Sequence, residues 1–387
     1  MDRRTFLWTS LATAATTPLF VGSSVGAARI LGSVGQINEI SEVFGPQPTR
    51  SIIPVVGDGK WIWKDPPEEE RGYLEPRSFS LRLGIEFEGT GPATQIKATT
   101  TAPSEFPEQQ IEDLDVKTQG CQAEVSMVGP GAAVLGLVAP SIRAGQMITA
   151  YADYKLKVYK RYDAYSAENF SAQQPKPPRE IARDYLGLSP GIETNNRAVK
   201  QLRDQLCGAE DHPWAQTETF SKWVWENIEP RIQRFTSVKV ALRERIGDCE
   251  ERAAIFVALA RAAGIPARLV WVPNHNWAEF YLTDNEGQGH WIPAHMSAYS
   301  WFGWTGAHEI VLQKGDRHEV PYRRGTFRLI PDWASWSGSK PNIRWTAELR
   351  PEATAEGEDA GPGARSKNEQ GDWKVVGEHP LDKYTRR

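Results

Sequence analysis

The stretch Ile246-Gly247-Asp248-Cys249-Glu250-Glu251-Arg252, followed by an apolar run over residues 253–260, decides the fold of this chain. Asp248 is a residue type that favours the N-cap position, so the pattern predicts a helix that begins at Cys249. Gly264 predicts the end of that helix. Because the run 253–260 is apolar on all sides, we expect the helix to be buried in the middle of a domain.

Cys249 is therefore expected in the first turn of a buried helix. The partial positive charge at a helix N-terminus stabilises a thiolate, which is the reactive form of cysteine. Glu250 and Glu251 oppose this effect, so a neighbouring imidazolium is needed to complete the activation. The position predicts that Cys249 is the nucleophile of a thiol enzyme.

Three strands are predicted after this helix, over residues 267–272, 275–282 and 290–295. A helix followed by neighbouring strands can bring Cys249, His275 and His295 to one point. Thiol chemistry needs such an arrangement, with an imidazole beside the thiol and a third group that orients the imidazole.

Several short motifs occur in a recognisable order along this part of the chain. They are Gly247-Asp248-Cys249, Gly264-Ile265-Pro266-Ala267-Arg268, His275-Asn276-Trp277-Ala278-Glu279, Trp291-Ile292-Pro293, Trp301-Phe302-Gly303 and Val311-Leu312-Gln313-Lys314-Gly315. Together they resemble the core of the transglutaminase-like superfamily. The resemblance implies a papain-like fold and attack of a cysteine thiolate on an amide carbonyl. The resulting thioester then passes its acyl group to water or an amine. On the matching positions, Cys249 is the nucleophile and His275 the general base and acid.

The third catalytic position departs from the family's pattern. Members usually have an aspartate where this chain has His295. A carboxylate would accept the imidazole proton and stabilise the imidazolium. A neutral His295 can accept that hydrogen bond but brings no negative charge, and a protonated one would repel His275. We therefore expect the thiolate–imidazolium pair to be less stable than in a relative with aspartate.

Two other functions remain open. One is a catalytically inactive binding module of the cell envelope, in which Trp277 and Trp291 line an aromatic groove for a peptide or a sugar-bearing ligand. The other is a zinc-binding protein in which Cys249, His275 and His295 are the ligands. The enzyme interpretation requires no cofactor and no metal. Its partner is a peptide or protein substrate.

The fold class predicted for the whole chain is α+β, with an N-terminal β-sandwich followed by a papain-like core. Residues 50–165 contain alternating segments such as 78–87 and 149–159, which predict the sandwich. Residues 180–345 contain the core motifs. Residues 350–387 are polar and poor in large apolar side chains, which predicts a disordered tail.

Residues 1–27 have the layout of a signal peptide. Arg3 and Arg4, followed by Thr-Phe-Leu, resemble the twin-arginine export signal. We therefore expect a periplasmic or extracellular protein. No later apolar segment approaches the length of about twenty residues that a membrane span needs.

The net charge and the number of cysteines give two further indications, on partners and on disulfides. The formal net charge of −4, without a basic stripe, argues against nucleic acid as a partner. The three cysteines, Cys121, Cys207 and Cys249, are an odd number, so at least one thiol is unpaired.

Overall fold

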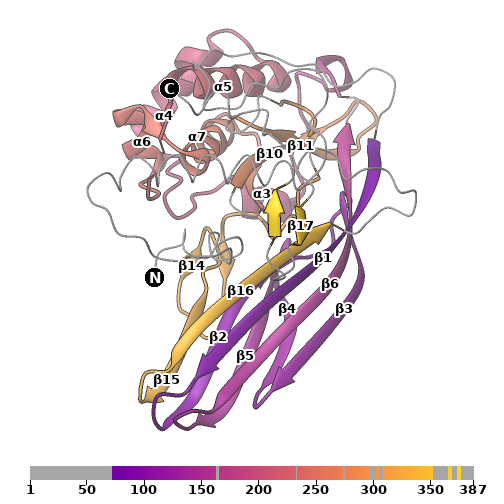
Figure 1. Cartoon of the computed structure of the whole chain (residues 1–387). Coiled ribbons are helices and arrows are strands. Elements are labelled where there is room, and N and C mark those ends of the chain that lie inside the picture. The colour runs from indigo at the N-terminus through magenta and orange to yellow at the C-terminus, as the bar shows by residue number, and fades with distance from the viewer. Residues whose placement is uncertain are drawn as a thin grey trace.

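The computed structural model describes residues 72–162, 165–231, 233–272, 275–296, 301–305 and 308–351, together with two short strands at 365–367 and 373–375. The predicted signal segment 1–27 and most of the predicted tail 350–387 lie outside the described residues. Figure 1 shows long strands packed at one end of the molecule, and helices around shorter strands at the other.

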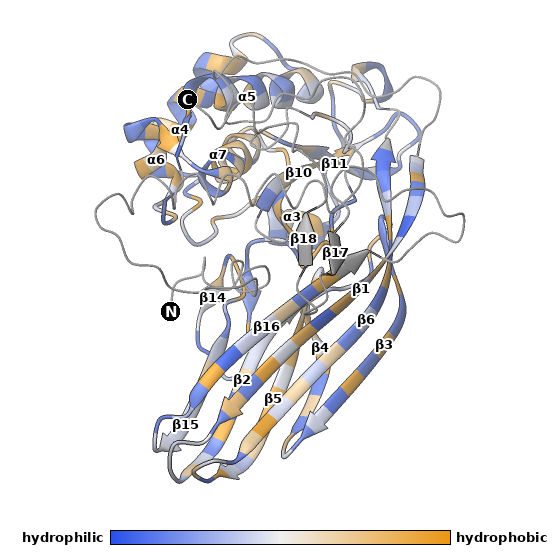
Figure 2. Ribbon diagram, in the orientation of Figure 1, coloured by the Kyte–Doolittle hydropathy of each residue, from blue (hydrophilic) through white to orange (hydrophobic). Residues whose placement is uncertain are grey.

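The first sheet of the long-stranded part has four antiparallel strands in the order β16-β1-β6-β3. Their bounds are β1 (Gly72–Glu88), β3 (Gln109–Gln119), β6 (Met147–Tyr162) and β16 (Asn342–Pro351). Leu83 of β1 lies opposite Ala152 of β6 and Ala347 of β16. Figure 2 shows hydrophobic and hydrophilic residues alternating along these strands, and the sequence predicted this alternation for residues 78–87 of β1 and 149–159 of β6.

The second sheet has eight strands, seven in the order β11-β10-β9-β12-β5-β2-β15, with β4 paired to β5. Their bounds are β2 (Ala93–Ala102), β4 (Gln122–Gly129), β5 (Ala132–Ile142), β9 (Ala267–Val272), β10 (His275–Thr283), β11 (Gly289–Ala294), β12 (Gln313–Lys314) and β15 (Trp333–Gly338). Apolar side chains of β2 and β5 pack against those of β1 and β6 in one buried core. The predicted β-sandwich is therefore confirmed.

The second sheet also connects the sandwich to the rest of the chain. Gln313 of β12 pairs with Ala132 of β5 on one side and with Trp271 of β9 on the other. Strands β15 and β16 return from the C-terminal side of the core to pair with β2 and β1. The division into residues 50–165 and 180–345 stays a prediction, to which the structure adds this shared sheet.

The helices surround one buried helix. Their bounds are α3 (Arg179–Tyr185), α4 (Arg197–Cys207), α5 (Pro213–Asn227), α6 (Val238–Glu244) and α7 (Cys249–Ala262), with a short 3₁₀ helix, η1 (Ala167–Asn169). Helix α7 contacts α4, α5 and α6 and packs against β9 and β10. Its Phe256 meets Phe280 of β10 edge to face, with ring centroids 6.0 Å apart. The expected buried helix on an antiparallel sheet is confirmed (Figure 1).

The remaining strands form three small two-stranded sheets. They are β7 (Glu229–Pro230) with β8 (Ile246–Gly247), β13 (His318–Glu319) with β14 (Thr326–Phe327), and β17 (Arg365–Lys367) with β18 (Trp373–Val375). Among the described residues, none of the helices combines the length and the apolar character needed to cross a membrane.

Candidate active site

Cys249 is the first residue of α7, as the sequence predicted, and its side chain is half-buried. The carboxylate of Asp248 accepts a hydrogen bond from the backbone N–H of Glu250 at 2.9 Å. The carboxylate of Glu251 accepts one from the backbone N–H of Asp248 at 3.0 Å, which completes a capping box. Gly247 is required here, because a Cβ at that position would lie 2.6 Å from the Cβ of Glu251.

Both glutamates beside Cys249 have partners of their own. Glu250 is buried and accepts a hydrogen bond from Nε of the equally buried Arg328 at 3.0 Å. Glu251 also accepts from the backbone N–H of Thr236 at 2.9 Å. A salt bridge balances the charge of Glu250, and backbone donors stabilise that of Glu251. The repulsion of a Cys249 thiolate is therefore smaller than the sequence suggested.

Arg252 brings a buried positive charge to the same turn of α7. Its guanidinium donates hydrogen bonds to the backbone oxygens of Trp225 at 2.9 Å, of Ile228 at 2.6 Å and of Met296 at 2.8 Å. Burial lowers its pKa to about 10, while the charge of Cys249 acts in the opposite direction. Arg252 is thus still charged at neutral pH, and its field favours a thiolate at Cys249.

Arg252 was not among the residues predicted from the sequence. The sequence did contain one indication of its role, which is an arginine in the first turn of an otherwise apolar, buried helix. An arginine at such a position is buried as well, and this requires hydrogen-bond acceptors for its guanidinium. Its bond to Met296 also fixes the first turn of α7 beside the residue that follows His295.

His275 and His295 lie at neighbouring ends of paired strands. His275 is the first residue of β10, and His295 follows the last residue of β11. Their ring centroids are 6.0 Å apart. The bond from Arg252 to Met296 links the turn that begins with Cys249 to the residue that follows His295. The catalytic roles of Cys249, His275 and His295 stay predictions.

Both imidazoles are buried among apolar and aromatic groups. Burial lowers the pKa of His275 to about 4. The pKa of His295 lies well below its usual value because of burial and, to a lesser extent, the neighbouring His275. Both rings are therefore neutral at pH 7. A neutral His275 is able to accept the proton of Cys249, but the imidazolium that results needs a negative charge nearby.

Glu309 supplies a carboxyl group that the sequence analysis missed. One of its carboxyl oxygens, Oε2, lies 3.9 Å from Nε2 of His295. One atom from each of His275, His295 and Glu309 lies within 4.8 Å of the corresponding atoms of the other two, and all three side chains are buried. We call these three residues the His–Glu cluster. The available signal was an acidic residue directly before the apolar segment 310–312.

The charge of Glu309 depends on its surroundings. Burial raises the pKa of this carboxyl group to about 8. The indole of Trp277 acts in the opposite direction, and the carboxylate of Glu108 adds to the increase. Glu309 is thus mostly protonated at pH 7 while both histidines are neutral. Formation of an imidazolium at His275 would favour loss of the Glu309 proton, because a nearby positive charge lowers the free energy of a buried carboxylate.

The two tryptophans predicted to line a groove have different surroundings. Trp277 is only 2% exposed and stacks on His295, with ring centroids 4.5 Å apart. It therefore packs against one face of the His295 ring and does not line an open groove. Trp291 is half-buried, and the guanidinium of Arg268 lies 3.8 Å from its ring centroid. A role for Trp291 in substrate binding stays a prediction.

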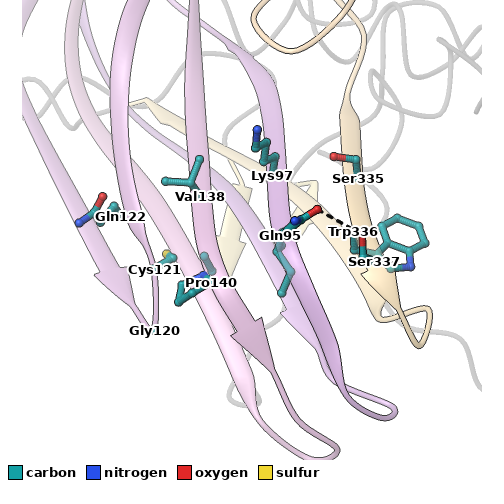
Figure 3. A pocket seen from close by; sticks show the side chains of 12 residues that line it. Gln95, Lys97, Gly120, Cys121, Gln122, Val138, Pro140, Ser335, Trp336 and Ser337 are labelled. Atoms are coloured by element: carbon teal, nitrogen blue, oxygen red, sulfur yellow. Dashed lines mark hydrogen bonds between the residues drawn. The ribbon is translucent and has the colours of Figure 1, made fainter.

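A separate cavity of about 840 Å³ lies in the sandwich, beside the turn at Gly120 and Cys121 (Figure 3). Its lining includes Gln95, Lys97 and Trp336, and no residue of the Cys249 region. Cys121, Cys207 and Cys249 form no disulfide with one another. Burial raises the pKa of both the Cys121 and the Cys207 thiol, so these two are poor nucleophiles.

Comparison with known proteins gives a match in the part of the chain that contains α5 to α7 and β9 to β11. Residues 200–296 match the family model of the Transglutaminase-like superfamily. An uncharacterised protein of Haemophilus influenzae is 34% identical over 107 residues, which are 24% of this chain and 28% of that protein. The chain thus spans little more than a quarter of the length of this curated relative.

Two solved structures are also similar. A candidate cysteine protease from Cytophaga hutchinsonii has a TM-score of 0.49 at 14% identity, over 73% of this chain and 92% of the other. A candidate protease from Parabacteroides distasonis has a TM-score of 0.24 at 15% identity, over 60% and 45% of the two chains. The family match covers Cys249, His275 and His295. The predicted α+β fold with a transglutaminase-like core is therefore confirmed.

Proposed function

We propose that this chain is a cysteine-dependent acyl-transfer enzyme that acts on peptide or protein amides through a thioester at Cys249. The observation that carries the proposal is the hydrogen bond that links the first turn of α7 to the residue after His295. Cys249 lies there beside the charged Arg252, and a bond from Arg252 to Met296 fixes that turn next to the His–Glu cluster.

The chemistry begins with proton transfer from the Cys249 thiol to His275. The thiolate attacks the amide carbonyl, and the His275 imidazolium then donates its proton to the departing amine. A thioester remains, and water or a second amine attacks it with His275 again acting as the base. The helix N-terminus and Arg252 favour the thiolate, while burial of His275 opposes the imidazolium.

Glu309 compensates for the aspartate that is absent at position 295. In the proposed mechanism His295 orients His275, and Glu309 releases its proton to solvent as the imidazolium forms and then supplies the negative charge that His295 lacks. The 3.9 Å separation between Glu309 Oε2 and His295 Nε2 supports this division of roles. The carboxylate thus comes from a different segment of the chain than in relatives with aspartate.

Alkylation of the full-length protein tests the proposal directly. Iodoacetamide is added at pH 7, and the labelling of each cysteine is followed by peptide mass spectrometry. We expect Cys249 to react at least about tenfold faster than Cys121 and Cys207, which serve as internal controls because burial raises their pKa values. His275→Gln should remove most of this advantage while the other two rates stay constant.

A substrate assay follows if the thiol is activated. Release of ammonia or of a peptide fragment reports hydrolysis, and incorporation of a fluorescent amine reports transfer. Both should be lost in Cys249→Ala. If Cys249 reacts no faster than a thiol in an unfolded peptide, the enzyme proposal fails and the inactive binding module is favoured.

We also propose export through the twin-arginine route. The support is the sequence of residues 1–27, with Arg3 and Arg4 before Thr-Phe-Leu. The test is fractionation of a bacterial host that expresses the full chain. Replacing both arginines by lysine should retain the protein in the cytoplasm, and unchanged export of that variant would contradict the proposal.

A further inference from the structure

We infer that His275, His295 and Glu309 form a binding site for a divalent transition-metal ion, with zinc as the expected occupant and without Cys249 as a ligand. Zinc sites commonly combine imidazole nitrogens with carboxylate oxygens at bond lengths of about 2.0–2.2 Å. The His–Glu cluster contains two imidazoles and one carboxyl group, and it leaves a fourth position for water.

The geometry of the cluster is close to that of a metal site. Its three candidate ligand atoms all lie within 4.8 Å of one another. Bond lengths of about 2.0–2.1 Å in a tetrahedron separate two ligands by roughly 3.3 Å. Contraction by about 1.5 Å or less therefore completes the site, which small side-chain rotations are able to supply.

Two polar atoms of the cluster lack hydrogen-bond partners among the described residues. They are Nε2 of His275 and Oε2 of Glu309. Both side chains are deeply buried, with 6% and 7% of their surface exposed. Burying a polar atom without a partner costs about 1–3 kcal/mol, so a ligand that satisfies both atoms at once would stabilise the site. Zinc does so with groups of the type it prefers.

The choice of donors also predicts selectivity. Calcium takes six to eight oxygen ligands and rarely nitrogen, whereas imidazole nitrogen suits zinc, cobalt and nickel. We therefore expect calcium not to bind at this site. The sequence had suggested zinc bound by Cys249, His275 and His295, and the structure replaces the thiolate by Glu309.

Metal binding would have a consequence for catalysis, which rests on the proposed function. A zinc ion bonded to Nε2 of His275 occupies a lone pair that the base requires. Zinc would then slow the alkylation of Cys249 at neutral pH, and a chelator would restore it.

Calorimetric titration of the metal-free, full-length protein with Zn²⁺ tests the site. We expect one ion per chain and no binding of Ca²⁺. Glu309→Gln, which has nearly the same shape, should weaken zinc binding at least tenfold, and His295→Asn should do the same. Cys249→Ser is the matched control and should bind as the wild type does. Thermal unfolding of each variant establishes that it is folded.

Cobalt gives a second measurement that does not depend on affinity. Bound Co²⁺ should show d–d absorption bands without a thiolate-to-cobalt charge-transfer band. Absence of zinc binding, unchanged binding in Glu309→Gln, or lost binding in Cys249→Ser would each overturn the inference. If zinc binds while Cys249 of the metal-free protein is unreactive, the enzyme proposal fails and the metal site stands.

Discussion

The imidazole of His295 lies nearly flat on the indole of Trp277, with ring centroids 4.5 Å apart and ring planes inclined by 19°. The pairing of β10 with β11 explains this contact. Ala278 lies opposite Ala294, so the next pair along the two strands is Trp277 and His295. Trp301 also meets His295 edge to face, with ring centroids 5.3 Å apart.

Replacing Trp277 by leucine should therefore loosen His295 and destabilise the protein. We expect a loss of about 2–4 kcal/mol, because a large buried side chain and its aromatic contact are both removed. Trp277→Phe should cost less, since a phenyl ring preserves the stack. Urea unfolding measures the loss, and the shift of the His295 ring protons in NMR spectra measures the stack. Equal effects of the two substitutions would contradict this role for Trp277.

Arg252 should control both the stability of the core and the ionisation of Cys249. Arg252→Met leaves the carbonyls of Trp225, Ile228 and Met296 without this donor, so we expect a loss of about 3–5 kcal/mol. The positive charge beside Cys249 is lost as well, which should raise the pKa of the thiol by about one unit. The pH dependence of Cys249 alkylation reports this pKa.

The same helix offers a control for Arg252. Arg261 is equally buried, lies in the last turn of α7, and forms a salt bridge with Asp316 at 2.8 Å. Arg261→Met should also destabilise the protein but leave the pKa of the Cys249 thiol unchanged, because it lies three turns away. A similar change of that pKa in both variants would show that Arg252 acts through folding alone.

The contrast between Cys249 and Glu309 shows what the sequence is able to predict. The start of α7 depends on Asp248, Glu251 and an apolar run, which are local signals, and the structure has the helix where they predict it. Glu309 belongs to a segment whose position depends on β12, and β12 pairs with both β9 and β5. No local pattern encodes that long-range pairing, so the carboxyl group beside His295 could not be predicted.

In the sandwich, too, local sequence patterns predicted the strands but not their long-range pairing. Alternation predicted β1 and β6 correctly, because one face of each strand is buried. The return of β15 and β16 to the sandwich was missed, since residues 333–351 follow the core motifs directly and contain no signal for their partners. Arg252 was missed for a related reason, as its three acceptors come from other elements.

Asp332 should make the protein less stable at alkaline pH. Burial raises the pKa of its carboxyl group to about 8, and a hydrogen bond from Thr100 at 2.7 Å offsets only part of this effect. A carboxyl group whose pKa is higher in the folded state stabilises that state fully at low pH. The contribution is lost as the pH rises from about 4 to about 8.

Asp332→Asn should therefore gain stability relative to the wild type as the pH rises from about 4 to about 8, and keep that gain at higher pH. We expect about 1–2 kcal/mol at pH 9, less than full burial would give, because the side chain remains partly exposed. Urea unfolding at several pH values measures the difference. Asp153→Asn is the control. Arg82 lowers the pKa of Asp153 to about 2, so the difference in stability between this variant and the wild type should not vary with pH above pH 6. A wild type and an Asp332→Asn variant with parallel pH profiles would refute the prediction.

His295→Asp should increase the reactivity of Cys249, because it restores a carboxylate beside His275. The new charge stabilises the imidazolium and therefore the thiolate, and one unit of pKa change corresponds to about 1.4 kcal/mol. We expect the alkylation rate at pH 7 to rise severalfold. His295→Asn has a similar shape without the charge and should give no increase.

The neighbouring Glu309 provides the decisive comparison for this substitution. In His295→Asp the two carboxyl groups are close, so the aspartate should raise the pKa of Glu309 further and keep it protonated. Glu309→Gln should then have little effect in the His295→Asp background, although it slows Cys249 alkylation in the wild type. An equal loss in both backgrounds, measured as a double-mutant cycle of alkylation rates, would show that Glu309 and residue 295 act independently and that Glu309 does not supply the missing charge.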